Sequence, residues 1–374
     1  MSRNVATHPE VRSNVARTAN PSCPGSPARL KNAMPPHPQL LAVIERRETL
    51  DRQAARELMT DILAGMLSDI EIAGLLGAMA GRGETAAEIA GFAETMRSAA
   101  TMLPLTAAES EQLVDTCGTG GDASGSFNIS TAAALVAAAA GAKVAKHGNR
   151  AITSRSGSAD VLEALGIPIH LAPQAAAEAL RTLGFCFLLA PSHHPAMKAV
   201  MPVRRALGVR TILHVLGPLL NPAGARRQVM GVYHARLVPL VGEALAMLGA
   251  EHALVVHGDG DGVKGQDEFA LSGPSEVAEV RNGSLRTYTV TPEDFGLTRA
   301  PLEALAGGDA VENAAILTAI FAGESGPPRD IVLMNAAAVL LTAGIAPSLR
   351  EGVDLAAKAI DSGAVRELVA RLRS

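Results

Sequence analysis

From residue 113 onward, the chain alternates between short runs of strand-forming residues and longer alanine-rich runs with helical spacing. This alternation limits the possible folds more than any other feature, because it is typical of a mostly parallel sheet with helices packed on its faces. The predicted strands are 113–117, 142–146, 185–189, 229–232 and 253–257. The predicted helices between them are 130–140, 158–165, 175–183 and 239–248. Asn282-Gly283 predicts a hairpin that adds antiparallel strands, and the tail from about residue 313 is helical again.

The residues before this region have a different pattern. Between 38 and 102, apolar side chains recur every three or four positions, which predicts helices. Two of the helix starts have the spacing of capping boxes, Ser68 with Glu71 and Thr85 with Glu88. We therefore expect the α/β class in two parts, a small all-helical domain at 37–105 and a larger α/β domain with a mostly parallel central sheet at 106–374.

Charge is distributed unevenly along the chain. The net charge of −4 combines +4 in residues 1–36 with −8 in the rest. Residues 1–36 lack the apolar stretch of a secretory signal, so we expect a disordered basic extension, with Met34 as an alternative start. Within the acidic remainder, 123–159 and 179–242 contain no Asp or Glu but hold twelve Lys and Arg residues. Burial explains the missing acids but not the remaining bases, which favour an anionic small-molecule ligand.

Composition excludes several classes of protein. The three cysteines lie far apart and form no CxxC pair, which indicates reduced thiols and a cytoplasmic location. No run approaches the roughly 18 apolar residues of a membrane span, so we expect no membrane partner. Aromatic residues make up only 2% and offer few stacking surfaces, so nucleic acid is not an expected partner either.

Three polar motifs lie at the ends of predicted strands or at the start of a predicted helix. The first is the glycine loop Asp115-Thr-Cys-Gly-Thr-Gly-Gly-Asp122, whose amides can approach a ligand closely. A dinucleotide site would need an acid about 20 residues further on, and 123–159 contains none. The second, Asn128-Ile-Ser-Thr131, is either a plain helix start or a helix N-terminus that receives phosphate. The third, Lys146-His-Gly-Asn-Arg150, is a solvated basic turn or, as we favour, an anion site at a strand end.

These motifs resemble the anthranilate phosphoribosyltransferase family. The matching strings are DTCGTGGD, NIST, KHGNR, SGSADVLEALG, HPAMK, PVRRALG and LGPLLNPA, in family order over roughly 37–374. The resemblance implies a fold shared with pyrimidine nucleoside phosphorylases, with a segment near 190–208 joining the helical domain. It also implies transfer of the phosphoribosyl group from 5-phosphoribosyl 1-diphosphate (PRPP) to anthranilate, which releases pyrophosphate in the second step of tryptophan biosynthesis from chorismate.

The resemblance also implies the residues of the site. Those expected to bind PRPP are Gly118, Gly121, Asp122, Ser126, Asn128, Ile129, Ser130, Thr131, Lys146, His147, Gly148, Asn149, Arg150, Ala151, Ile152, Thr153, Ser154 and Ser158. Gly118, Asn149 and Arg204 match positions that meet anthranilate, and the Arg204 guanidinium suits its carboxylate. The implied cofactor is Mg²⁺, two ions per subunit, held by Ser130, Asp267 and Glu268. A homodimer is implied as well.

Other candidate metal residues are weaker. Asp259-Gly-Asp261 begins like an EF-hand, but Val263, Lys264 and Ala270 occupy positions that such a loop gives to other residues. The connection 262–266 is longer than the family usually has.

The histidines have several alternatives. His147 is a candidate for orienting the amine, and no residue is assigned as the catalytic base. His193 and His194 as a metal pair are disfavoured, because consecutive side chains point apart. His214 stands where the family has Asn and is expected to be a satisfied helix residue.

Two other functions remain open from the sequence. Nucleoside phosphorolysis on the same fold would need a base pocket in place of the Asn149 and Arg204 set. A non-catalytic nucleic-acid-binding relative is disfavoured by the charge of −8 outside the extension and by the retained acidic pair.

Overall fold

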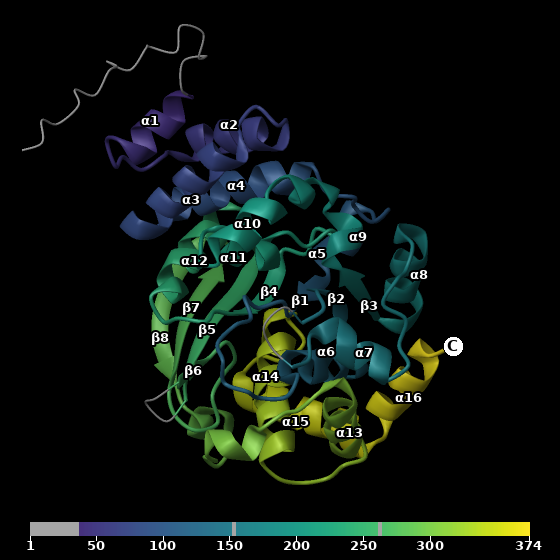
Figure 1. Ribbon diagram of the computed structural model, residues 1–374. Coiled ribbons are helices and arrows are strands. Elements are labelled where there is room, and N and C mark those ends of the chain that lie inside the picture. Colours follow the sequence, from purple (N-terminus) through teal and green to yellow (C-terminus); the bar gives the residue numbers. More distant parts are fainter. Residues whose placement is uncertain (1–36, 152–154, 261–263) are drawn as a thin grey trace, which may run out of the picture. The chain divides into compact units, whose positions relative to one another are not determined.

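The computed structural model describes residues 37–151, 155–260 and 264–374. Met34 and the rest of the expected extension lie outside these residues, as do Ile152, Thr153, Ser154 and Asp261–Val263. The described part begins with helices, as the apolar spacing predicts (Figure 1). They are α1 (Pro38–Ile44), α2 (Arg52–Leu63), α3 (Asp69–Arg82), α4 (Ala86–Ser98) and the short α5 (Ala107–Glu111).

Both predicted capping boxes start helices. The Ser68 hydroxyl accepts from the Glu71 amide before α3, and the Glu71 carboxylate accepts from the Ser68 amide. Thr85 and Glu88 do the same before α4. Each pair satisfies amides that have no partner within the helix, which fixes where the helix begins.

A mixed sheet forms the centre of the α/β part. Its strands are β1 (Leu113–Asp115), β2 (Lys143–Gly148), β3 (Phe185–Leu189), β4 (Arg227–Gly231), β5 (His252–Gly260), β6 (Lys264–Gln266), β7 (Ser275–Arg281) and β8 (Ser284–Val290). The order is β3-β2-β1-β4-β5-β7-β8, with β6 paired to β5. The first five strands of that order are parallel, and β6, β7 and β8 are antiparallel to their neighbours. The predicted fold class is confirmed.

The predicted hairpin is also confirmed. Asn282 and Gly283 connect β7 to β8, with φ of 49° and 80°. Two consecutive positive φ values define the turn type whose twist matches that of the flanking strands, and Asn-Gly adopts it most readily. The bounds of two predicted strands need correction: β2 continues past 146 to Gly148, so His147 and Gly148 also belong to the strand, and β1 ends at Asp115 rather than 117.

Helices cover both faces of the sheet. After β1 and β2 come α6 (Ile129–Ala139), α7 (Ser158–Ala164) and α8 (Pro173–Leu183). The segment before β4 holds α9 (Ala190–His193), η1 (Pro195–Ala199), α10 (Met201–Leu207), α11 (Leu213–Leu216) and η2 (Gly217–Leu219). After β4 come α12 (Leu237–Met247), η3 (Pro292–Phe295), η4 (Leu302–Leu305), α13 (Ala310–Phe321), α14 (Pro327–Thr342), α15 (Leu349–Asp361) and α16 (Ala364–Leu372).

Alternate residues of the strands supply two separate cores. Val144, Val229 and Leu254 point toward α6, α14 and α15, which lie together in Figure 1. Met230 and Val255 point the other way and pack with α12 and the N-terminal helices. The period of two along a strand produces this division. In addition, α10 packs against α3, and η1 packs against α2. Among the described helices, none combines the length and apolar character needed to cross a bilayer.

Candidate active site

The predicted site residues gather where the parallel strands end. The glycine loop follows β1, Lys146 to Gly148 form the end of β2, and Asp267 and Glu268 follow β6. Carboxyl ends of parallel strands are where open α/β sheets bind ligands. The sheet therefore brings together three motifs that lie far apart in sequence.

Backbone-to-backbone packing shapes the glycine loop. The Thr119 amide donates to the Gly231 carbonyl at the end of β4 (2.9 Å). A Cβ on Gly118 would lie 2.9 Å from that carbonyl oxygen, and a Cβ on Gly231 would lie 1.5 Å from the Asp267 carbonyl oxygen. Only glycine permits such approaches. Gly231 was not predicted as a site residue, because its role depends on a partner distant in sequence.

The acidic pair faces this loop. The Asp267 Oδ2 accepts from the Gly120 amide (2.6 Å), and the Asp267 amide donates to Asp122 Oδ2 (3.2 Å). Glu268 Oε1 accepts from the Ser130 amide in the first turn of α6 (3.0 Å). Burial, together with the neighbouring carboxylates of Asp122 and Glu268, raises the pKa of Asp267 well above its usual range. Burial also raises the pKa of Glu268 to about 7, against the attraction of Lys146.

Lys146 is a buried cation beside these acids. Its side chain is 2% exposed, and Nζ donates to Thr116 Oγ1 (2.9 Å) and to Ser130 Oγ (3.4 Å). Burial lowers the pKa of Lys146, while Asp115, Glu268 and Asp267 favour its charged form. The ammonium group therefore lies between the glycine loop and the start of α6.

The Asn128–Thr131 motif does start α6, although Asn128 does not cap it. The Asn128 Oδ1 instead accepts from Asn313 Nδ2 (2.9 Å) and from Ser156 Oγ (3.2 Å). Ser126 is tied locally, with its hydroxyl 3.0 Å from that of Ser124. Asn128 thus connects the motif to the 155–158 segment and to α13.

His147 is buried at the end of β2. Its amide donates to Asp115 Oδ1 (3.0 Å), and its ring meets that of His194 edge to face at 5.1 Å. Burial, with smaller effects from His194 and His193, lowers the pKa of His147 to about 3. A neutral imidazole of such low basicity is a weak general base.

The other histidines have local partners. His193 Nδ1 pairs with the Thr101 carbonyl (2.9 Å), so His193 and His194 contact different groups. His214 lies in α11, and its Nδ1 accepts from the Thr211 amide (3.1 Å), as expected of a satisfied helix residue.

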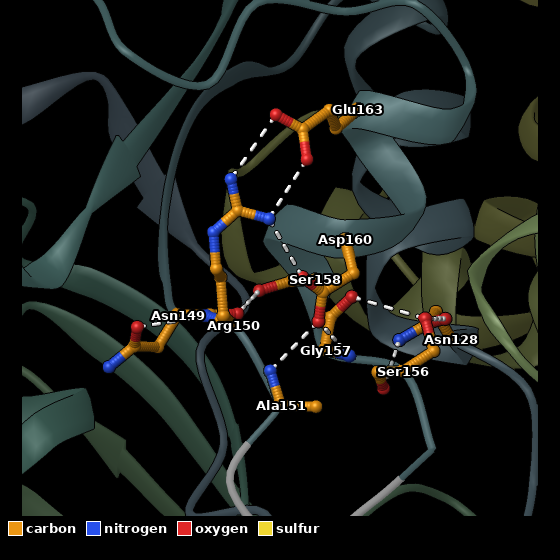
Figure 2. Close-up of polar contacts among 9 residues, drawn as sticks. All are labelled: Asn128, Asn149, Arg150, Ala151, Ser156, Gly157, Ser158, Asp160 and Glu163. Atoms are coloured by element: carbon orange, nitrogen blue, oxygen red, sulfur yellow. Dashed lines mark hydrogen bonds and ion pairs between the residues drawn. The ribbon is translucent and has the colours of Figure 1, made fainter.

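The acceptor candidates lie on three segments, with Gly118 on the glycine loop and the other two elsewhere. Arg204 is on α10 and half-buried, and burial lowers its pKa. Burial lowers the pKa of His214 to about 4, and the positive charge of Arg204 makes the second-largest contribution to this decrease. Asn149 follows β2, and its Oδ1 accepts from the Arg150 amide (2.8 Å). The Arg150 guanidinium turns toward α7, where it pairs with Asp160 and Glu163 (Figure 2).

One structural link was missed by sequence reasoning. Arg210, two residues after Gly208 at the end of α10, donates to the Gly121 carbonyl and lies 3.7 Å above the ring centroid of Tyr233. Its place in an acid-free basic segment was the only signal. This contact ties the segment that carries Arg204 to the glycine loop.

Comparison with known proteins identifies the family of this chain. Residues 110–366 match the α/β domain of a glycosyl transferase family, and residues 38–100 match the helical bundle domain of the same family. The anthranilate phosphoribosyltransferase of Anaeromyxobacter sp. (strain K) is 50% identical over 334 residues, which are 89% of this chain and 97% of that protein.

Solved structures are similar as well. The anthranilate phosphoribosyltransferase of Thermus thermophilus is 47% identical, with a TM-score of 0.82 over 89% of this chain and 98% of that one. The Saccharomyces cerevisiae enzyme in complex with PRPP and Mg is 27% identical, with a TM-score of 0.78 over 89% and 96%. The structure of the Saccharomyces cerevisiae enzyme in complex with 4-fluoroanthranilate is 26% identical, with a TM-score of 0.76 over 90% of this chain and 97% of that one. With half of its residues identical to a relative over nearly the whole shared length, and with the same fold, the chain belongs to the anthranilate phosphoribosyltransferase family.

Proposed function

We propose that this chain transfers the 5-phosphoribosyl group of PRPP to the amine of anthranilate. The products are N-(5-phosphoribosyl)anthranilate and pyrophosphate, and the reaction is the second step from chorismate to tryptophan. One observation carries the proposal: the half-buried pair Asp267 and Glu268 contacts the glycine loop and the start of α6 by accepting from the Gly120 and Ser130 amides. Carboxylates beside a glycine loop and a helix start suit a diphosphate that arrives with a divalent cation.

The acidic residues fit Mg²⁺. The half-buried carboxylates of Asp122, Asp267 and Glu268 lie close together, as the raised pKa of Asp267 indicates, and a divalent cation would neutralise part of their charge. No set of three His, Cys, Asp or Glu side chains within the described ranges is arranged to hold a metal on its own. Mg²⁺ commonly takes one or two carboxylates and completes its shell with water and substrate phosphates. When bound, it would neutralise charge on the departing pyrophosphate.

We extend this to two ions per subunit, with Asp267, Glu268 and the Ser130 hydroxyl as ligands. Three carboxylates and a diphosphate together carry more negative charge than Lys146 and one divalent ion neutralise. The Saccharomyces cerevisiae complex that contains PRPP and Mg supports the metal in general.

The donor half of the site is proposed at the glycine loop, the start of α6 and the end of β2. Its residues would be Gly118, Gly121, Asp122, Ser126, Asn128–Thr131, Lys146–Asn149, Ala151 and Ser158, together with Ile152–Ser154 outside the described residues. Arg150, the remaining residue expected from the family resemblance, pairs with Asp160 and Glu163 and is assigned an indirect role. Lys146 supports this assignment best, because its buried ammonium faces the loop rather than solvent. In the reaction, the bond from the anomeric carbon to the diphosphate oxygen breaks, and Lys146 stabilises the charge that leaves.

The acceptor half is proposed at Gly118, Asn149 and Arg204. A half-buried guanidinium on α10 suits the planar carboxylate of anthranilate. The amine forms the new bond to the anomeric carbon and then loses one proton to solvent. An aromatic amine is weakly basic and already unprotonated at neutral pH, so positioning supplies much of the rate. His147, neutral and buried, is proposed to orient the amine rather than to act as the base.

The division into domains is also proposed. Helices within 37–105, with the segment near 190–208, would form the helical domain, and 106–374 would form the α/β domain. Packing of α10 on α3 and of η1 on α2 supports the return of the chain to the helical part. We further propose a homodimer and a cytoplasmic location.

The decisive experiment follows the fluorescence of anthranilate. Purified protein with PRPP and Mg²⁺ should reduce this fluorescence, and a metal chelator should stop the loss. Cleavage of thymidine by phosphate, with anthranilate fluorescence unchanged in the presence of PRPP, would instead assign nucleoside phosphorolysis.

A further inference from the structure

One carboxylate joins two pieces of chain that carry residues of the proposed donor site. Asp160, in the first turn of α7, accepts from the Ala151 amide (2.8 Å) and from the Gly157 amide (2.9 Å) through the same oxygen, Oδ2. Figure 2 shows Asp160 between these two amides. The pieces 149–151 and 156–158 are thereby held side by side, one directly after β2 and the other leading into α7.

Contacts with Asn149 hold the same pieces together. The Asn149 carbonyl accepts from the Ser158 hydroxyl (3.2 Å) and from the Ala159 amide (3.2 Å). At Gly157 the two pieces are so close that a Cβ would lie 2.4 Å from the Ala151 nitrogen. The arrangement is therefore specified by hydrogen bonds and by the absence of a side chain at Gly157.

Arg150 forms ion pairs with both acids of α7, Asp160 and Glu163. The Arg150 Nη1 lies 3.0 Å from Asp160 Oδ1 and 2.9 Å from Glu163 Oε2. Burial opposes ionisation of Asp160, yet the two amides and Arg150 hold its pKa below its usual value. In Figure 2 the side chain of Arg150 runs toward α7, whereas that of Asn149 points away from this helix. The Arg150 guanidinium is thus already paired with carboxylates.

We propose that Asp160 is a positioning residue for phosphoribosyl transfer. By accepting hydrogen bonds from the Ala151 and Gly157 amides, it fixes the nearby residues Asn149 and Ser158 in position. Arg150 serves the reaction through Asp160 and Glu163 and does not contact the diphosphate. This inference rests on the proposed function, because it concerns the same site and the same two substrates.

The first test is Asp160→Asn, which removes the charge but keeps the size and one acceptor. Loss of hydrogen bonds to a charged group should raise the KM for PRPP by about tenfold, with kcat reduced by less than about threefold. The matched control is Asp294→Asn, because Asp294 likewise caps a helix, η3, by accepting from the Thr291 amide (2.7 Å), but does so away from the site. A purely structural role would reduce the yield or melting temperature and leave KM unchanged.

The second test is a double-mutant cycle between Arg150→Ala and Asp160→Asn. If Arg150 acts through Asp160, its removal should cost about tenfold in kcat/KM in the wild-type background and little in the Asp160→Asn background. A parallel cycle with Glu163→Ala uses a more exposed partner, so it remains informative even if Asp160→Asn folds poorly. In that cycle, the double variant Arg150→Ala with Glu163→Ala should lose less kcat/KM than the product of the two separate fold-losses.

Three results would be contrary. If Arg150→Ala reduces kcat/KM about tenfold in every background, Arg150 contacts substrate, and its indirect role is overturned. An unchanged KM for Asp160→Asn, beside an active wild type, would overturn the inference alone. A wild type that leaves anthranilate unchanged in the presence of PRPP and Mg²⁺ would overturn the proposed function and this inference with it.

Discussion

The side chains of Asp115 and Asn221, more than a hundred positions apart, share a buried hydrogen bond of 2.8 Å from Asn221 Nδ2 to Asp115 Oδ2. The other Asp115 oxygen accepts from the amides of Thr116 and His147 (2.7 and 3.0 Å). Asn221 Nδ2 also donates to the Ala145 carbonyl (2.8 Å). Asp115 therefore fixes the beginning of the glycine loop against the end of β2. Burial raises its pKa to about 6, although these donors favour the ionised form.

Replacing Asn221 should destabilise the protein. In Asn221→Ala, Asp115 Oδ2 loses its donor in a place that water does not reach readily, so the free energy of unfolding should fall by about 1–3 kcal/mol. Asn221→Asp should cost more, because it places a second carboxylate beside the first. Urea unfolding followed by circular dichroism measures both. Equal midpoints for Asn221→Ala and wild type would contradict the role of this bond.

Removing the acidic pair should remove the response to Mg²⁺. Asp267→Ala combined with Glu268→Ala should abolish the increase in turnover on titration with Mg²⁺, and should also remove the stabilisation of the protein by Mg²⁺ with PRPP in a thermal melt. The matched control replaces another pair of consecutive acids, Glu293→Ala with Asp294→Ala on η3, and should leave the dependence of turnover on Mg²⁺ unchanged. If the acidic variant keeps the wild-type titration curve, the metal lies elsewhere.

Arg204→Ala should separate the two substrates. Loss of the guanidinium that is proposed to pair with the anthranilate carboxylate should raise the KM for anthranilate by about tenfold or more, with a smaller change for PRPP. The neighbouring exposed Arg205→Ala is the control and should change neither value. Steady-state kinetics with each substrate varied in turn provides the measurement. Equal increases for both substrates would argue against a carboxylate contact.

The contact of Arg210 with Tyr233 should support the glycine loop. Stacking of a guanidinium on an aromatic ring contributes about 0.5–1 kcal/mol at exposed sites, so Tyr233→Leu should raise the KM for PRPP severalfold. Tyr233→Phe keeps the ring and should match the wild type. Arg210→Ala also loses the bond to the Gly121 carbonyl and should have the larger effect. A KM for PRPP that is unchanged in Arg210→Ala would show that the loop needs no such support.

Local patterns predicted the elements that depend on local chemistry. Reciprocal side-chain and backbone bonds start α3 and α4 at Ser68 and Thr85, and the φ values at Asn282 and Gly283 suit the residues that occupy them. The family strings likewise indicated which strand ends carry the proposed site. These features lie within a few neighbouring residues, so the sequence displays them directly.

Contacts between distant segments were less visible. Asn128 has the composition of a helix cap, yet Ser156 and Asn313 occupy its side chain. Arg150 lies in a basic motif, yet the two acids of α7 follow it by 10 and 13 residues and hold its guanidinium. In both cases the partner is decided by how the sheet and helices bring segments together, which no local pattern states.

A last prediction concerns stability far from the site, at Glu279 on β7. Its carboxylate pairs with His252 Nε2 (3.0 Å) and with Arg286 (2.6 Å), and the hydrogen bond from His252, helped by those from Arg286 and Tyr288, lowers its pKa from 4.5 to about 2. Because the folded pKa lies below the ordinary value, these contacts stabilise the fold fully above about pH 4.5 and are lost as the pH falls toward 2. Glu279→Gln should lower the free energy of unfolding by about 1–3 kcal/mol at pH 7. The difference from wild type should shrink between pH 4.5 and 2, as urea unfolding at several pH values would measure. Glu276→Gln, exposed on the same strand, should show no such difference, and a Glu279→Gln difference that stays constant with pH would mean that the charge of Glu279 contributes nothing.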